Sequence, residues 1–182
     1  MTQSLNIAVA GATGYVGIEL VKILLKHSKA RILYLCANKT AGKSMKTYIK
    51  NTNIKQLPKI TKIKNVIWNK INVLFTALPN GEAQKISRDL PDHVRLIDLS
   101  GDFRLENYKE YEKWYGVKHQ SINNIKNSTY AVTEFSRNNL RKSKIISCPG
   151  CYPTSIQIPL IPLLKKRMIN IKNIIIDSKS GY

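Results

Sequence analysis

With 182 residues, 43% of them hydrophobic, the chain is long enough for one well-packed domain and part of a second, and its composition excludes a disordered protein. No apolar run approaches the roughly 20 residues of a membrane-spanning helix, and the N-terminus lacks the pattern of a secretory signal, so we expect a cytoplasmic protein without a membrane partner. The net charge of +19 is scattered along the chain without a recognition-helix or aromatic pattern, so we expect an anionic small molecule as partner and no nucleic acid.

Apolar strands alternate with helix-like segments over most of the chain. Leu5 to Ala10 is expected to be a buried strand, and Gly14 to Lys26 has helical spacing. The apolar stripe of this first helix is expected to comprise Val16, Leu20, Ile23 and Leu24. Further strands are expected at 32–37, 73–76, 95–98 and 144–147, and a helix at 82–90. This alternation predicts an α/β fold, a Rossmann-type doubly wound parallel sheet with helices on both faces.

The second half of the chain is less regular. The stretch 101–141 is too long for an ordinary connection and is expected to hold short helices and functional loops. A helix is expected at 155–168 and a final strand at 174–177. We therefore expect residues 1–148 to form a cofactor-binding domain and residues 149–182 to begin an α+β catalytic domain that the chain does not complete.

A glycine-rich loop connects the first strand to the first helix. Glycines at this place allow a tight turn, and they let a pyrophosphate approach the backbone N–H groups at the start of the helix. The residues predicted to bind the dinucleotide are Gly11, Thr13, Gly14, Tyr15, Val16 and Gly17. The same glycine spacing also fits a turn that binds nothing, so the loop by itself leaves both possibilities open.

The end of the second strand favours NADP over NAD. Enzymes that use NAD usually place a carboxylate there for the ribose hydroxyls. This chain has no carboxylate at that place, while Lys39 and Lys43 could meet a 2′-phosphate. Either lysine could equally be a solvated surface charge.

Cys151 is expected in a tight turn directly before a helix. The free N–H groups and the dipole at a helix N-terminus stabilise a thiolate and make the thiol reactive at neutral pH. Cys36 is expected to be a small buried hydrophobic residue. A lone C-x-x-C spacing of Cys148 with Cys151 is weak evidence for zinc and could be a redox pair, so no metal site is predicted. A dinucleotide fold followed by a reactive cysteine suggests that the thiolate displaces phosphate from an acyl phosphate and that hydride then reduces the thioester.

Several blocks of sequence together resemble the N-acetyl-gamma-glutamyl-phosphate reductases of the arginine pathway. The most specific blocks are Asp98-Leu-Ser-Gly-Asp-Phe-Arg104 and Pro149-Gly-Cys-Tyr-Pro-Thr154; others are the glycine loop, 41–43, 77–81, 111–119, Tyr130 with Glu134, and 177–181. The resemblance implies NADPH-dependent reduction of N-acetyl-glutamyl 5-phosphate to the 5-semialdehyde through a thioester on Cys151. It also implies that Ser100 and Arg104 lie at the substrate, although each could instead shape its loop.

The resemblance also implies features of the family that we do not find in this sequence. The family has a longer second domain, which contributes a catalytic histidine and a helix that returns to the first domain, and it forms homo-oligomers. His27, His93 and His119 do not match that histidine, so the 182-residue chain by itself is expected to be a fragment with little or no activity. Cys148 stands where the family usually has asparagine, and a disulfide of Cys148 with Cys151 is a hypothesis for reversible silencing. The alternatives are a related reductase of aspartyl or amino-adipyl phosphate, and an inactive dinucleotide-binding remnant.

Overall fold

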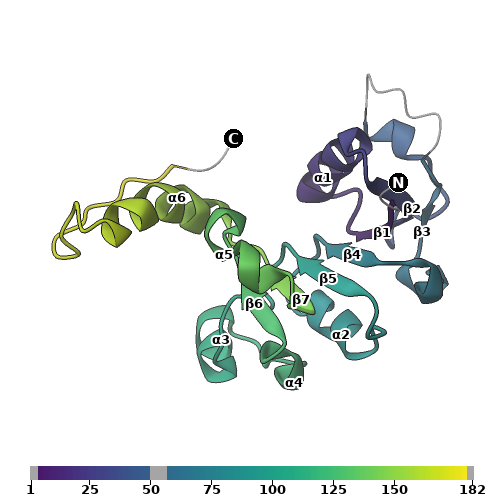
Figure 1. The fold of residues 1–182 in the computed structure, drawn as a ribbon. Coiled ribbons are helices and arrows are strands. Elements are labelled where there is room, and N and C mark those ends of the chain that lie inside the picture. The colour runs from purple at the N-terminus through teal and green to yellow at the C-terminus, as the bar shows by residue number, and fades with distance from the viewer. Residues whose placement is uncertain (1–3, 50–56, 180–182) are drawn as a thin grey trace.

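The computed structural model describes residues 4–49 and 57–179, and its centre is a parallel sheet (Figure 1). Within the described residues the strands are β1 (Leu5–Ala10), β2 (Ala30–Cys36), β3 (Ile60–Thr61), β4 (Val73–Thr76), β5 (Arg95–Asp98), β6 (Ser128–Tyr130) and β7 (Ile145–Ser147). They lie in the order β3-β2-β1-β4-β5-β7-β6, and all of their pairings are parallel. The predicted Rossmann-type sheet is therefore confirmed.

Helices connect most of these strands. They are α1 (Tyr15–Lys26), α2 (Glu82–Arg88), α3 (Tyr108–Tyr115), α4 (Ile122–Ile125), α5 (Thr133–Leu140) and α6 (Cys151–Lys165), with 3-10 turns η1 (Met45–Thr47), η2 (Ile63–Asn65) and η3 (Trp68–Lys70). The short helices expected within 101–141 are present. The sequence did not predict β3 and β6, because strands of two and three residues are too short to show a periodic pattern. Among the residues that the structure describes, no helix is long and apolar enough to cross a membrane.

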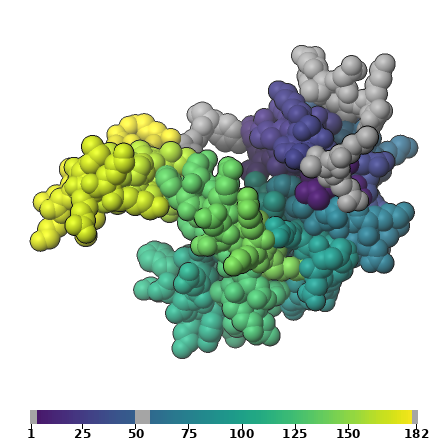
Figure 2. Space-filling model, in the orientation of Figure 1, coloured from purple at the N-terminus to yellow at the C-terminus, as the bar shows by residue number. Residues whose placement is uncertain are grey.

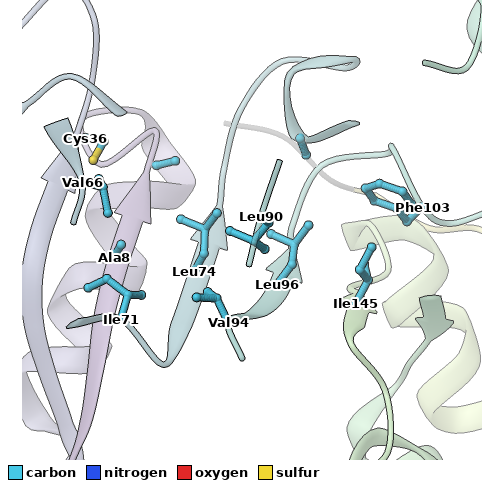
Figure 3. Close-up of a cluster of buried hydrophobic side chains, with 12 residues drawn as sticks. Ala8, Cys36, Val66, Ile71, Leu74, Leu90, Val94, Leu96, Phe103 and Ile145 are labelled. Atoms are coloured by element: carbon cyan, nitrogen blue, oxygen red, sulfur yellow. The ribbon is translucent and has the colours of Figure 1, made fainter. Parts of the chain in front are cut away.

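Two hydrophobic clusters cover the two faces of the sheet. Successive strand residues point to opposite faces, so β1 contributes Ile7 and Val9 to one cluster and Ala8 and Ala10 to the other. The first cluster packs under α1. The second, shown in Figure 3, packs around Leu74 of β4 and Leu96 of β5 and includes Ala83 of α2. Because the strands are parallel, the loops that follow them lie at one edge of the sheet.

The buried side of α1 differs from the predicted stripe. Gly17, Val21 and Leu24 are buried, whereas Val16 and Ile23 are 51% and 64% exposed. Gly17 sets this orientation, because a Cβ atom on it would lie 2.1 Å from the carbonyl oxygen of Gly11. The helix therefore turns its glycine toward the loop, and the stripe expected through Val16 and Ile23 is wrong.

The C-terminal segment projects from the sheet (Figures 1 and 2). Its helix begins at Cys151, earlier than the expected 155, and none of the residues of α6 is buried. The strand expected at 174–177 is wrong: these residues have no regular structure, and Ile175 is 94% exposed. A strand needs a hydrogen-bonding neighbour, and no described strand lies beside this segment. The end of the sequence block 177–181 lies outside the described residues.

Candidate active site

The functional loops predicted from sequence share the carboxyl edge of the sheet. In a parallel sheet all strands end at the same edge, where open α/β folds bind their ligands. The glycine loop follows β1, and the loop that leads to Cys151 follows β7. Three strand spacings separate β1 from β7 in the sheet, a distance of about 14 Å at roughly 4.8 Å per spacing.

The glycine loop is packed too closely for side chains at two of its positions. Gly11 has φ +83°, and a Cβ atom on it would lie 2.0 Å from the carbonyl oxygen of Ala77, in the loop after β4. Gly17 meets the carbonyl oxygen of Gly11 equally closely. The loop is fixed to β2 because the N–H groups of Gly11 and Ala12 both donate to the carbonyl oxygen of Cys36, at 2.9 and 3.1 Å.

The remaining residues predicted for the cofactor surround the start of α1. Gly14 is its N-cap, with no capping side chain, and Tyr15 and Val16 in its first turn are exposed. The structure thus leaves a helix N-terminus with a positive dipole end and small or exposed residues around it, an arrangement suited to a pyrophosphate. A dinucleotide therefore fits the residues that the sequence assigned to it.

The loop after β2 lies against the glycine loop. The hydroxyls of Thr13 and Thr40 are 3.3 Å apart and hydrogen-bonded, a contact that sequence reasoning missed. Lys39 and Lys43 are both exposed, on either side of Thr40. The two predicted lysines therefore belong to a loop that touches the cofactor loop.

A buried polar layer lies at the ends of β4, β5 and β7. The Oδ1 atom of Asp98 accepts hydrogen bonds from the Thr76 hydroxyl, the Ser100 backbone N–H and the Ser100 hydroxyl, at 2.8, 3.0 and 2.7 Å. Asp98 Oδ2 and the hydroxyl of Ser147, its register partner on β7, are fully buried without a hydrogen-bond partner. Burial raises the pKa of Asp98, while its hydrogen bonds with Ser100 and Thr76 act in the opposite direction.

Asp102 joins the loop after β5 to α2 and α3. Its carboxylate accepts from the backbone N–H groups of Gly81 and Gln84, from the Gln84 side-chain amide and from the Tyr111 hydroxyl, at 2.7 to 3.2 Å. His119 contacts the carbonyl oxygen of Asp102 at 2.9 Å and is buried. The loop that carries Ser100 and Arg104 is thus held from two sides. The specific Asp-Phe-Arg block marked these residues in the sequence, but only the fold reveals the partners from α2 and α3.

The cysteine loop places Cys151 as the first residue of α6. Gly150 is the N-cap, and its carbonyl oxygen accepts from the N–H and the hydroxyl of Thr154, at 3.0 and 2.8 Å. Cys151 is exposed and Cys148 is half-buried. Burial raises the pKa of the Cys148 thiol to about 11, so that thiol is protonated at neutral pH.

Cys36 is buried, as the sequence predicted, and burial raises the pKa of its thiol to about 12. Its carbonyl oxygen holds the glycine loop, but its side chain belongs to the core. Of the three cysteines, Cys151 combines an exposed position with a helix N-terminus.

Ser100 and Arg104 lie in the loop after β5, next to the cysteine loop. The Ser100 side chain is directed inward to Asp98. Arg104 is half-buried, and its Nε and Nη2 atoms donate to the carbonyl oxygens of Cys148 and Leu99, at 2.9 and 3.2 Å. The structure therefore brings Arg104 to the cysteine loop and engages the hydroxyl of Ser100 within its own turn.

Two family models match the chain in succession. The semialdehyde dehydrogenase NAD-binding domain matches residues 6–143, and the semialdehyde dehydrogenase dimerisation domain matches residues 151–182. Among solved structures, aspartate semialdehyde dehydrogenase with NADP from Candida albicans is similar with a TM-score of 0.63 and 19% identity, covering 90% of this chain and 48% of that one.

Curated relatives are considerably more similar in sequence. "Probable N-acetyl-gamma-glutamyl-phosphate reductase, chloroplastic" from Arabidopsis thaliana is 39% identical over 98% of this chain and 45% of the relative. N-acetyl-gamma-glutamyl-phosphate reductase from Ehrlichia canis is 41% identical over 100% of this chain and 52% of the relative. The chain therefore spans about half the length of the curated relatives that it matches.

Proposed function

Because the chain belongs to the semialdehyde dehydrogenase family and carries its NAD-binding domain, we propose that it is part of an NADPH-dependent reductase of N-acetyl-glutamyl 5-phosphate. The observation that carries the proposal is the position of Cys151, exposed on the first turn of α6 at the same sheet edge as the glycine loop. The names of the relatives at about 40% identity support the choice of substrate.

The proposed cofactor site comprises the glycine loop and the loop after β2. The pyrophosphate would lie at the N-terminus of α1, where Gly11 and Gly17 leave no room for a side chain. Lys39 and Lys43 would hold the 2′-phosphate that distinguishes NADPH from NADH, and Thr40 connects their loop to Thr13.

Replacing these lysines tests the preference for NADPH. We expect Lys39→Ala and Lys43→Ala each to weaken NADPH binding by roughly tenfold while NADH binding changes little, since each removes a charge-assisted contact to phosphate. Lys26→Ala is the matched control, because Lys26 is an exposed lysine at the other end of α1. If all three variants weakened NADPH binding equally, the effect would come from the overall positive charge of the chain and not from a contact with the 2′-phosphate.

The proposed chemistry begins with the thiolate of Cys151. The thiolate attacks the carbonyl carbon of the acyl phosphate, the bond from that carbon to the phosphate oxygen breaks, and inorganic phosphate leaves with the electron pair. NADPH, when bound, supplies the hydride that reduces the resulting thioester. Release of the aldehyde then breaks the carbon–sulfur bond and returns the thiolate of Cys151.

The other groups near Cys151 have supporting parts in this proposal. Two donors of the Arg104 guanidinium are used by backbone carbonyls. Its other N–H groups would donate to the phosphate of the substrate. Ser100 would contribute by shaping the loop through Asp98, because its hydroxyl is engaged there. We place the proton donor in the part of the reductase that corresponds to the second half of the relatives.

Acylation of Cys151 tests the reaction directly. The chain is mixed with N-acetyl-glutamyl phosphate, and phosphate release and the mass of the cysteine peptides are recorded. We expect one N-acetyl-glutamyl group on Cys151, none in Cys151→Ala, and unchanged acylation in Cys148→Ser, the matched control. Preferential acylation by aspartyl or amino-adipyl phosphate would favour the related reductases, and NADPH binding with no acylation would favour a dinucleotide-binding remnant.

Assembly and domain organisation belong to the same proposal. A boundary between residues 143 and 151, the interval that contains the predicted one at 148/149, is supported by the family models, one ending at residue 143 and the other beginning at residue 151. The match of 151–182 to a dimerisation domain supports a homo-oligomer, and the exposed apolar residues Ile158, Met168 and Ile171 would be covered there. A cytoplasmic location stays a prediction from sequence, and the Arabidopsis thaliana relative is named chloroplastic.

A further inference from the structure

We propose that Arg104 is a positioning residue for Cys151: its guanidinium ties the cysteine loop to the loop after β5 through one backbone carbonyl of each, and it holds a permanent positive charge beside the first turn of α6. This inference rests on the proposed role of Cys151 as nucleophile. It concerns how the thiol is prepared for attack and is separate from any contact of Arg104 with substrate.

Two hydrogen bonds join Arg104 to two different loops. Its Nε atom donates to the carbonyl oxygen of Cys148, at the start of the cysteine loop, at 2.9 Å. Its Nη2 atom donates to the carbonyl oxygen of Leu99, at the start of its own loop, at 3.2 Å. Because the planar guanidinium offers its donors in a rigid fork, the two loops are held at a fixed separation.

Gly150 lies against the third nitrogen of the same guanidinium. A Cβ atom on Gly150 would come within 3.2 Å of Arg104 Nη1, which is tighter than ordinary contact. The backbone of Gly150, with φ −73° and ψ 172°, is one that any residue can adopt. Space for the guanidinium is therefore the physical reason for glycine at this N-cap.

The charge of Arg104 acts on the cysteine loop. Burial raises the pKa of Cys148 and the charge of Asp98 raises it further, whereas the charge of Arg104 lowers it. Cys151 begins α6 one residue after Gly150, so the same charge adds to the helix dipole at this thiol. The two fields have the same sign, and both favour the thiolate.

Of the two buried carboxyl groups nearby, Asp98 acts against Arg104 at the cysteine loop. Asp102 is engaged by donors from α2 and α3, on the other side of its loop. Asp98 opposes Arg104 at the cysteine loop, because its charge raises the pKa of Cys148 by more than the charge of Arg104 lowers it, while burial disfavours the charged form of Asp98. Among the described residues that we have placed at this edge of the sheet, Arg104 is thus the cation that contacts the cysteine loop directly.

The test is the pH dependence of alkylation of Cys151 by iodoacetamide, followed by mass analysis of its peptide in the 182-residue chain. We expect Arg104→Gln to move the midpoint of the pH profile upward and to slow alkylation at neutral pH by about tenfold, with the same limiting rate at high pH. Arg104→Lys keeps the positive charge but loses the planar guanidinium, so we expect its midpoint to lie between those of the native chain and Arg104→Gln. Arg88→Gln is the matched control, removing an exposed charge at the far end of α2.

Gly150→Ala provides an independent test if Arg104→Gln does not fold. The added methyl group would push the guanidinium away by a few tenths of an ångström, so we expect a smaller upward shift of the midpoint in the native background and no further shift in an Arg104→Lys background. A midpoint that is unchanged in every variant, or a rate that falls equally at all pH values, would overturn the inference. A native Cys151 that is alkylated no faster than a free cysteine in a peptide would instead contradict the proposed function.

Discussion

Asp98 shows how a single residue at the sheet edge combines burial with function. It is fully buried, three hydrogen bonds converge on one of its oxygens, and the other oxygen has no hydrogen-bond partner. The bonds from Ser100 start the turn that ends in Arg104, so this carboxyl shapes the loop on which the inference about Cys151 depends. The cost of burying the charge is the reason that the pKa of Asp98 is raised.

The raised pKa predicts a particular pH dependence of stability. Because burial raises the folded-state pKa of Asp98 above the ordinary value of 3.8, the folded chain binds this proton more tightly than the unfolded chain does. The contribution of Asp98 to stability is therefore fully present below the unfolded pKa and is lost as the pH rises through the folded pKa. We expect Asp98→Asn, which keeps the accepting oxygen, to gain stability relative to the native chain as the pH is raised. Urea unfolding at several pH values between about 4 and 8 measures this difference, and a constant difference would contradict it.

At the scale of elements, α1 illustrates why the hydrophobic pattern gave the helix but not its orientation. The apolar residues around its circumference allow more than one stripe, and the spacing of Val16, Leu20, Ile23 and Leu24 is compatible with a buried face. The close contact of Gly17 with Gly11 turns the helix so that Val21 and Leu24 face the sheet. The orientation of α1 thus depends on the contact of a glycine with a backbone carbonyl, which a hydrophobicity pattern does not show.

A pair of neighbouring substitutions in α1 tests this orientation. Leu24 is 7% exposed and Ile23 is 64% exposed. We expect Leu24→Ala to lower the free energy of unfolding by about 2–4 kcal/mol through the cavity that it leaves. Ile23→Ala, the matched control, should change it by less than about 0.5 kcal/mol. Urea denaturation measures both, and comparable losses would restore the stripe predicted from sequence.

At the scale of the molecule, the described chain consists of a well-covered sheet and a projecting C-terminal segment (Figure 2). The sheet has apolar clusters on both faces, whereas α6 contributes no buried residue. Its contacts with the sheet domain include the hydrogen-bonded pair of Tyr130 and Gln157 and the ammonium of Lys165 over the ring of Phe135. On the face that carries α1, Phe75, Ile97 and Ile146 are half-buried, so this part of the sheet has room for further cover.

These contacts predict that the sheet domain is stable without α6. Because α6 contributes no buried residue, we expect a chain that ends at Gly150 to unfold in one transition and to lose no more than about 2 kcal/mol relative to the 182-residue chain. Denaturant unfolding followed by circular dichroism measures the change. A loss of more than about 4 kcal/mol would mean that α6 is an integral part of this core.

The sequence by itself determined the features that depend on local chemistry. The strands β1, β4 and β5 have their predicted bounds, because each has an apolar centre and is flanked by turn residues. The glycine loop and the cysteine turn were recognisable because turns and helix starts require particular residues at adjacent positions, whereas the Asp-Phe-Arg block was recognised by its resemblance to the reductase family.

Only the tertiary structure decided what depends on partners distant in the chain. It turned α1 onto Gly17, left 174–177 without a neighbouring strand, and assembled the layer of Thr76, Asp98 and Ser147 from three strands. It also brought the guanidinium of Arg104 to the carbonyl oxygen of Cys148, 44 residues further along the chain. Close packing and hydrogen bonding between strands are satisfied across the sheet, so the sequence of one segment does not contain that information.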